Sequence, residues 1–325
     1  MSDETRSVFP GVRLHVVTGK GGTGKTTVAA ATALALAHGG KRVILLEVEG
    51  RQGIAQLFDT APLPHEERKL AVAEGGGEVW ALAVDPTTAL LEYLEMFYNL
   101  RRAGSALRKM GAIDFVTTIA PGLRDVLLTG KACELVRRIE KGQPNAYDAV
   151  VLDAPPTGRI TRFLNVNAEV SGLAKVGPIR NQADSVMSVL RSPRTAVHVV
   201  TLLEEMPIQE AVDGIAELTS VRIPVGSVIV NMTQPRELDT VPTRSELAAA
   251  LAEAGLTGER ANEHVLDALM VEGAEYLQRE ELEARERGLL ASLDEPLLQL
   301  PLKSGGIDLG ALYELAADLR RQGLS

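Results

Sequence analysis

The sequence "VVTGKGGTGKTTVAAATALA", from Val16 to Ala35, places a glycine-rich loop between a strand-like run and a helix-like run. The apolar, β-branched residues "VRLHVVT" from Val12 precede the loop, and an Ala- and Leu-rich stretch follows it as far as Gly39 and Gly40. A second apolar run, "KRVILLEV" from Lys41, comes directly afterwards. Because glycines commonly end helices, the order predicts strand, loop, helix and strand, which is a parallel βαβ unit.

Apolar runs of strand length recur along the chain and are mostly separated by helical segments. Further runs of this kind begin at Glu78, Tyr147, Thr195, Val225 and Pro296. Hydrophobic residues make up 45% of the chain and aromatic residues only 3%, so the core should consist mainly of Ala, Leu, Val and Ile. Six or seven such strands alternating with helices predict an α/β fold with a doubly wound, mostly parallel sheet.

Two segments interrupt this alternation within the single domain that we expect over residues 1–325. The first, about 86–141, carries apolar residues at helical spacing and is expected to be a helical insertion. It includes an apolar cluster that could either cover the core or meet a partner: Leu90, Leu91, Leu94, Met96, Phe97, Tyr98 and Leu100. The second segment, about 243–293, is charged and should form outer helices with opposite charges at helical spacing.

The charge and residue content restrict the classes of partner. The chain has 43 acidic and 34 basic residues and a net charge of −9, which argues against broad nucleic-acid or anionic-membrane binding. Met1 to Gly11 lacks the apolar stretch of a signal peptide, and no run approaches a membrane span. We therefore expect a cytoplasmic protein without stable membrane insertion. The single cysteine, Cys133, permits no internal disulfide, and His15 and His198 lie in strand-like runs where core positions are expected.

The glycine-rich loop fits the phosphate-binding pattern of two glycines, lysine and threonine, here Gly19, Gly24, Lys25 and Thr26. Glycines let backbone amides curl around phosphate oxygens, and the helix that follows directs its positive dipole end at them. Lys25 should reach the β and γ phosphates, and the Thr26 hydroxyl is suited to ligate Mg²⁺. The nucleotide-binding residues expected in this loop are Gly19, Lys20, Gly21, Gly22, Thr23, Gly24, Lys25, Thr26 and Thr27.

Lys20 is a second lysine in a loop that needs one. Lys25 already supplies the positive charge, so Lys20 cannot be explained as a copy of the same function. A remaining use is to stabilise charge on a nucleotide held by a second subunit, as an arginine finger does, which contributes about 10³ to 10⁵ in rate. The loop therefore suggests a dimer.

"GKGGTGKTT" resembles the deviant Walker A motif of the SIMIBI-class ATPases, among them the ArsA, Get3, MinD, ParA and nitrogenase iron proteins. In that class the lysine corresponding to Lys20 reaches across a dimer interface. "YDAVVLDAPPTGRITRFL", from Tyr147 to Leu164, is similar to the signature of the ArsA and Get3 branch. The resemblance implies a P-loop ATPase that uses ATP and Mg²⁺ as cofactors.

The same resemblance implies roles for residues far from the loop. Asp153 corresponds to the Walker B aspartate, which holds Mg²⁺ through a bound water, and Pro156, Thr157 and Gly158 correspond to switch II. Asn231 in "VIVNM" matches the residue that reads adenine. The "LPL" run matches the strand that closes the base pocket and contributes Pro301 and Leu302.

Switch I departs from the family pattern. Glu49 stands at the family's aspartate and Gly50 at its proline, so the carboxylate is one methylene longer. A misplaced water would slow hydrolysis, and we expect slow ATP turnover with Lys20, Lys25 and Glu49 as the catalytic residues. Arg159 replaces the switch II histidine, with no predicted consequence.

The leading hypothesis is a dimeric ATPase that opens and closes with nucleotide state and acts on a protein partner. The dimer could be a homodimer or a heterodimer with a paralogue. One alternative is a MinD- or ParA-like positioning ATPase, although the C-terminal helix-like tail has a charge balance poorly suited to anionic lipid. Another is an ATP-binding regulatory subunit paired with a more active paralogue. A metal or metalloid carrier is disfavoured because Cys133 stands alone.

Overall fold

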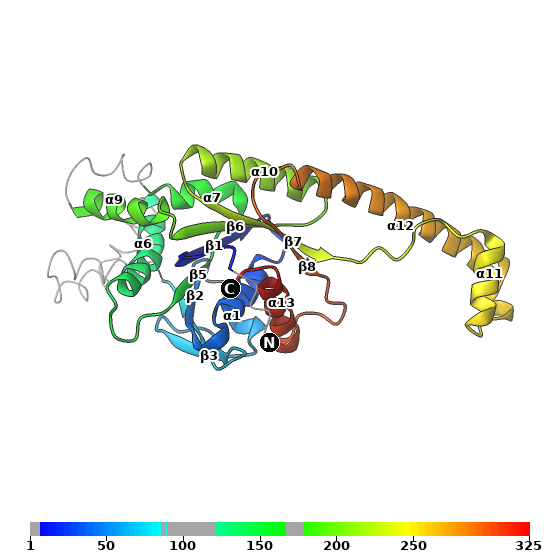
Figure 1. The fold of residues 1–325 in the computed structure, drawn as a ribbon, viewed down its shortest axis with the longest axis horizontal. Coiled ribbons are helices and arrows are strands. Elements are labelled where there is room, and N and C mark those ends of the chain that lie inside the picture. The colour runs from blue at the N-terminus through cyan, green and yellow to red at the C-terminus, as the bar shows by residue number, and fades with distance from the viewer. Residues whose placement is uncertain (1–6, 86–88, 90–120, 167–177) are drawn as a thin grey trace.

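The computed structural model describes residues 7–85, 89, 121–166 and 178–325, which form an eight-stranded sheet between two layers of helices (Figure 1). The strand order is β3-β4-β2-β5-β1-β6-β7-β8, with β1 at the centre between β5 and β6. All neighbours are parallel except β3 and β4, so the expected α/β fold with a mostly parallel sheet is confirmed. The strands are β1 Leu14–Gly19, β2 Arg42–Glu47, β3 Arg68–Val72, β4 Glu78–Ala83, β5 Ala149–Asp153, β6 Thr195–Thr201, β7 Val225–Thr233 and β8 Leu297–Pro301.

Strand β3 adds one strand to the six or seven that the sequence predicts. It pairs only with β4, antiparallel, at one edge of the sheet, and its residues are half-buried or exposed. The Lys69 Nζ donates to the Glu78 carboxylate at 2.6 Å. The charged residues that make β3 hard to recognise in the sequence therefore help to hold it against β4. An edge strand needs no apolar run, and charged residues there discourage pairing with other chains.

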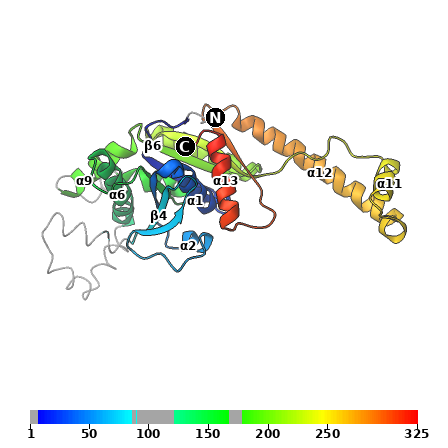
Figure 2. The same cartoon turned by 60° about the horizontal axis from the view of Figure 1, so that its bottom comes forward.

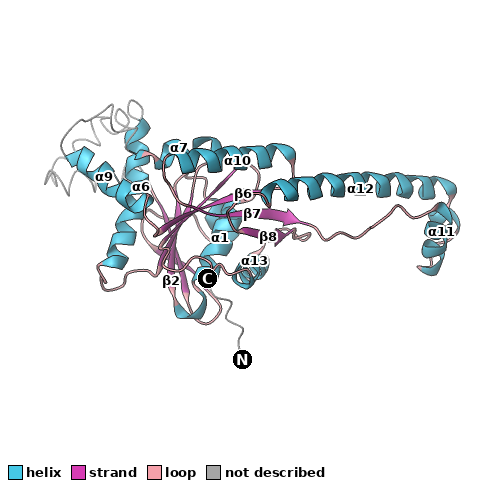
Figure 3. Ribbon diagram, turned by 45° about the horizontal axis from the view of Figure 1, so that its top comes forward, coloured by secondary structure: helices cyan, strands magenta, loops and turns pink. Residues whose placement is uncertain are grey.

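The helices divide into two layers that cover the two faces of the sheet (Figure 3). Helices α1, α2 and α13 contribute to one core cluster, and α6, α7, α9 and α10 to the other. Successive residues of β1 alternate between them, with Val16 in one cluster and Val17 in the other. The helices are α1 Lys25–Leu36, α2 Gly53–Leu57, α6 Pro121–Glu140, α7 Thr157–Leu164, α9 Pro178–Leu190, α10 Glu205–Ser220, α11 Arg244–Glu253, α12 Glu263–Leu290 and α13 Leu309–Arg321, with 3-10 turns η1 His38–Gly40 and η2 Gly258–Ala261.

The two buried histidines are core residues, as expected. His15 on β1 and His198 on β6 stack with ring planes 7° apart, and the His15 Nδ1 lies 3.0 Å from the His198 Nε2. The His198 Nδ1 in turn lies 2.7 Å from the hydroxyl oxygen of Ser227 on β7. Burial lowers the pKa of His198 to about 4, so both rings are neutral at physiological pH and form a polar network across three strands.

Helices α11 and α12 project from the rest of the fold as an arm (Figures 1 and 2). The 28 residues of α12 span about 42 Å at 1.5 Å per residue. Thr243 and Glu246 form a capping box at the start of α11, and Asn262 caps α12. No residue of α11 is buried. Most residues of the two helices are half-buried or exposed.

Only part of the predicted insertion at 86–141 falls within the described residues. Helix α6 occupies its second half and packs against α9, with Cys133 buried between them. The apolar cluster predicted from Leu90 to Leu100 lies outside the described residues, so its two interpretations stay open. Across the described ranges, no helix has the length and apolar character to cross a bilayer.

Candidate functional site

The glycine-rich loop runs from the carboxyl end of β1 to the start of α1, where parallel α/β sheets bind ligands. Gly19 lies against the neighbouring strand, and a Cβ there would meet the Val200 carbonyl oxygen at 2.2 Å. Gly24 has φ +83°, a left-handed conformation that other residues rarely adopt, and directly precedes α1. The two glycines thus form a loop whose backbone donors and helix N-terminus can surround phosphate.

The remaining loop residues line the same turn. Gly21 and Gly22 are exposed at its crest, whereas Thr23 is buried and its hydroxyl donates to the Lys20 carbonyl oxygen at 2.9 Å. Thr26 and Thr27 stand in the first turn of α1. The residues predicted for this loop thus run without interruption from the carboxyl end of β1 into the first turn of α1.

The two loop lysines have different surroundings. The Lys25 Nζ turns into the loop and donates to the Lys20 carbonyl oxygen at 3.4 Å, and burial lowers the pKa of Lys25. The Lys20 Nζ lies 3.7 Å from a carboxylate oxygen of Glu210 on α10, and its side chain is 30% exposed. Lys25 is thus directed into the loop, whereas Lys20 is paired with Glu210 and partly exposed.

Thr26 and Asp153 meet beneath the loop. The Thr26 hydroxyl donates to a carboxylate oxygen of Asp153 at 2.8 Å. Burial raises the pKa of Asp153 to about 7, which means that water and protein groups solvate this carboxylate poorly. A hydroxyl and an under-solvated carboxylate are hard oxygen donors of the kind that Mg²⁺ prefers, so these residues fit the predicted ion.

Glu47 is a third acidic residue of this site, and the sequence reasoning missed it. Its Cα is the register partner of Asp153 on the adjacent strand, its side chain is only 3% exposed, and its charge contributes to the raised pKa of Asp153. The Glu47 Oε2 has no hydrogen-bond partner in the part of the chain that the structure describes. The signal was present in "EVE", because an acid two residues before Glu49 points to the same side of an extended chain.

Glu49 follows β2 and forms ion pairs with two arginines. One Glu49 oxygen lies 3.6 Å from Arg51 and the other lies 3.9 Å from Arg159. Gly53, at the start of α2, brings this segment against α1, since a Cβ there would lie 3.3 Å from the Thr26 methyl group. The predicted switch I carboxylate is therefore next to the loop, and Arg159 of the predicted switch II is one of its partners.

Pro156, Thr157 and Gly158 form the start of α7, directly after the strand that ends in Asp153. Thr157 is 2% exposed, and its hydroxyl donates to a carboxylate oxygen of Glu210 at 2.6 Å. The segment is also linked to the glycine-rich loop, because the Thr18 hydroxyl donates to the Pro155 carbonyl oxygen at 2.7 Å.

Residues predicted for the base pocket lie at the ends of β7 and β8. Asn231 is buried, and its Nδ2 donates to the Thr23 carbonyl oxygen at 2.9 Å, which places it against the loop. Pro301 ends β8, and the amide of the exposed Leu302 donates to the Thr233 carbonyl oxygen at 2.9 Å. The structure thus brings Asn231 to the loop, whereas adenine reading by Asn231, Pro301 and Leu302 stays a prediction.

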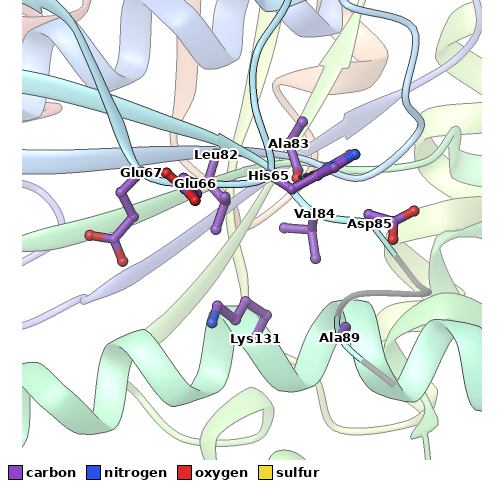
Figure 4. A pocket seen from close by; sticks show the side chains of 9 residues that line it. All are labelled: His65, Glu66, Glu67, Leu82, Ala83, Val84, Asp85, Ala89 and Lys131. Carbon is purple, nitrogen blue, oxygen red and sulfur yellow. Dashed lines mark hydrogen bonds between the residues drawn. The ribbon is translucent and has the colours of Figure 1, made fainter. Parts of the chain in front are cut away.

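A separate cavity of about 270 Å³ lies between β4 and α6 (Figure 4). Lys131 on α6 lies across it from Val84, and acidic side chains lie along its rim. It is lined by His65, Glu66, Glu67, Leu82, Ala83, Val84, Asp85, Ala89 and Lys131, none of which belongs to the predicted nucleotide site.

Known proteins resemble this chain over most of its length. The family described as "Anion-transporting ATPase" matches residues 12–193. The chain is 52% identical over 324 residues to ATPase BagA of Mycobacterium tuberculosis, which covers 98% of this chain and 95% of that protein. It is 28% identical to ATPase GET3 of Kluyveromyces lactis, over 69% of this chain and 72% of that protein. It is 26% identical to an arsenical pump-driving ATPase of Acidiphilium multivorum, over 86% of this chain and 49% of that protein.

The family match spans the glycine-rich loop, Glu49, Asp153 and the start of α7, so the region of similarity contains most of the site. The resemblance to the ArsA and Get3 branch is thereby confirmed. The chain belongs to the anion-transporting ATPase family, and its family and relatives identify it as an ATPase.

Proposed function

We propose that this chain is a Mg²⁺-dependent ATPase that works as a dimer, opens and closes with nucleotide state, and acts on a protein partner. The dimer is either a homodimer or a heterodimer with a paralogue. We take residues 1–325 as one P-loop ATPase domain, with an insertion at about 86–141 and outer helices at about 243–293.

The observation that carries the proposal is the different placement of the two loop lysines. The Lys25 Nζ lies inside the phosphate loop, 3.4 Å from the Lys20 carbonyl oxygen. The Lys20 Nζ instead lies 3.7 Å from Glu210 on α10, with 30% of its side chain exposed. A partly exposed cation beside a phosphate site can reach a second subunit, where it would stabilise phosphoryl-transfer charge as an arginine finger does.

The chain's own residues divide the work at the site. Gly19 and Gly24 shape the loop that binds phosphate, and Lys25 supplies its positive charge. Thr26 and Asp153 would hold Mg²⁺, Asp153 through water, and the ion neutralises phosphate charge when bound. Glu49 orients the attacking water, while Asn231, Pro301 and Leu302 surround the base.

Slow turnover is part of the proposal and is supported by the contacts of Glu49. Its two oxygens are paired with Arg51 and Arg159, so it must exchange a cation for water before it can act. Its side chain is also one methylene longer than that of the family's aspartate, and small errors in position are costly in rate.

The test is light scattering on the purified full chain with and without Mg²⁺-ATP, together with measurement of phosphate release. We expect ATP to convert monomer to dimer and Lys20→Ala to abolish that conversion. Lys25→Ala serves as the matched control, because it should abolish ATP binding itself. If Lys20→Ala leaves both dimerisation and turnover unchanged, the intersubunit function of Lys20 is wrong. If dimers form only with an added paralogue, the heterodimer is favoured.

A further inference from the structure

Glu210 on α10 contacts both of the segments that should respond to nucleotide. One carboxylate oxygen accepts a hydrogen bond from the Thr157 hydroxyl at 2.6 Å, and the other lies 3.7 Å from the Lys20 Nζ. Thr157 opens switch II after β5, and Lys20 belongs to the loop after β1. A single side chain therefore joins two functional segments through separate oxygens.

The packing around Thr157 shows that this contact is closely held. Thr157 is 2% exposed, and a Cβ on Gly214, one helical turn after Glu210, would lie 3.4 Å from the Thr157 methyl group. Helix α10 thus packs closely against the start of α7, and the hydroxyl of Thr157 and the carboxylate of Glu210 meet at hydrogen-bond distance. A displacement of Thr157 must therefore move Glu210 or break its hydrogen bond.

The other contact is weaker and more easily broken. Both Lys20 and Glu210 are about one-third exposed, at 30% and 31%, and ion pairs with that much solvent are worth little. For Lys20 to reach a nucleotide in another subunit, as the proposed function requires, its ammonium has to leave Glu210. The pair therefore has to open in the proposed dimer.

We propose that Glu210 is a positioning residue that retains Lys20 within its own subunit and links its release to movement of Thr157 in switch II. This inference rests on the proposed intersubunit function of Lys20. It assigns α10 a part in the nucleotide cycle in addition to its place over the sheet. Gln at position 210 keeps an oxygen for the Thr157 hydroxyl but removes the charge that retains Lys20.

The first experiment measures Lys20 in the ATP-free protein, independently of dimerisation. Acetic anhydride labels exposed lysines, and mass spectrometry gives the rate at each site. In Glu210→Gln we expect Lys20 to label about two- to fivefold faster, the range for a partly exposed ion pair. The exposed Lys41, which lies before β2 and away from the site, is the internal reference and should not change. Glu217→Gln, which removes an exposed charge from the same helix, should leave the Lys20 rate unchanged.

The second experiment measures ATP-dependent dimerisation by light scattering. We expect Glu210→Gln to lower the ATP concentration for half-maximal dimerisation by about two- to fivefold. In a Lys20→Ala background, where dimerisation is lost, Glu210→Gln should leave ATP affinity by isothermal titration unchanged, whereas a merely structural loss would persist there. Thermal unfolding checks that each variant is folded.

The outcomes separate the two proposals. Equal Lys20 labelling in Glu210→Gln and Glu217→Gln overturns the retention of Lys20. Faster labelling with an unchanged ATP requirement overturns its link to dimerisation. Suppose that Lys20 labels faster in Glu210→Gln but the wild-type chain never dimerises with ATP or with a paralogue. The proposed function then fails, while the retention of Lys20 stands.

Discussion

The Asn231 Nδ2 donates a hydrogen bond to the Thr23 carbonyl oxygen at 2.9 Å, so the end of β7 is fixed to the phosphate loop. The contact leaves little space, because a Cβ on Gly24 would lie 2.4 Å from the same nitrogen. The expected base-binding residue and the phosphate loop are therefore one packed unit. Changes in either should affect nucleotide affinity through the other.

Gly24→Ala should weaken ATP binding by about tenfold or more, since it adds a clash with Asn231 to the cost of a left-handed conformation. Gly22→Ala is the matched control: Gly22 has φ +90°, but a Cβ there meets no atom within 4 Å. Isothermal titration with ATP should give a smaller loss for Gly22→Ala. A double variant, Gly24→Ala with Asn231→Ala, should recover part of the loss. Equal losses in the two glycine variants would contradict this account.

Asp153→Asn should slow ATP turnover while stabilising the nucleotide-free protein. An outer-shell metal contact is worth about 10- to 100-fold, which is the expected fall in turnover. Burial raises the pKa of Asp153 to about 7. Ionisation of the carboxyl therefore lowers the free energy of unfolding as pH rises from the pKa of the unfolded chain toward 7, and this cost is absent below both pKa values. Above pH 7 the variant avoids that cost, up to about 4 kcal/mol at 1.36 kcal/mol per pKa unit. Urea unfolding without Mg²⁺ at pH 8 measures the gain, and a loss of stability there would be inconsistent with the raised pKa.

Glu47→Gln should act in the same direction because Glu47 lies beside Asp153 in a buried position. Removing one of two like charges relieves repulsion and lowers the pKa of Asp153. We expect increased stability at pH 8 and weaker dependence of turnover on Mg²⁺ concentration. Glu217→Gln on α10 is a control that removes an exposed carboxylate away from Asp153. A Glu47 variant that resembles it in both measurements would exclude Glu47 from the site.

The phosphate loop could be predicted from local rules, whereas the role of Asp153 came from the resemblance of "YDAVVLDAPPTG" to the family signature. A strand, a glycine-rich turn and a helix fix the backbone, and parallel strands end at the same edge of a sheet. Glu47 was missed although "EVE" places it two residues before Glu49, and the strand register then sets it opposite Asp153. The contact of Glu210 with Lys20 and Thr157 depends on how α10 packs, which no local pattern encodes.

Strand β3 was missed for a related reason. Its sequence "RKLAV" carries two charges and no run of strand length, and it owes its conformation to pairing with β4. Edge strands of this kind are specified by the partner strand and by cross-strand pairs such as Lys69 with Glu78. The central strands could be recognised from the sequence alone, because strands buried on both faces form continuous apolar runs.

Glu49→Gln should lower the turnover number by about 100-fold or more if Glu49 orients the attacking water. Arg159→Ala removes one of its ion partners and should change turnover by less than about fivefold, because a pair whose arginine is 60% exposed is worth little. Steady-state phosphate release for the two variants gives the comparison. A loss in Arg159→Ala as large as that in Glu49→Gln would instead give the arginine a direct part in the reaction.

The stacked pair His15 and His198 should make the protein sensitive to acid. Burial lowers the pKa of His198 to about 4, against 6.5 for the free side chain, and lowers that of His15 as well. The unfolded chain therefore binds more protons than the folded one in this interval, so the stabilising contribution is complete above pH 6.5 and is lost as pH falls toward 4. For His198 alone the loss is about 3 kcal/mol at 1.36 kcal/mol per pKa unit.

Urea unfolding of the wild type and of His198→Asn at pH 7, 6, 5 and 4.5 tests this expectation. The variant has a lower free energy of unfolding at pH 7, because it breaks the contacts with His15 and Ser227. Its free energy of unfolding should nevertheless fall less steeply below pH 6.5, since one buried titrating ring is gone. His264→Asn removes an exposed histidine and should keep the wild-type slope. Parallel curves for the wild type and His198→Asn would show that the buried pair does not set the acid sensitivity.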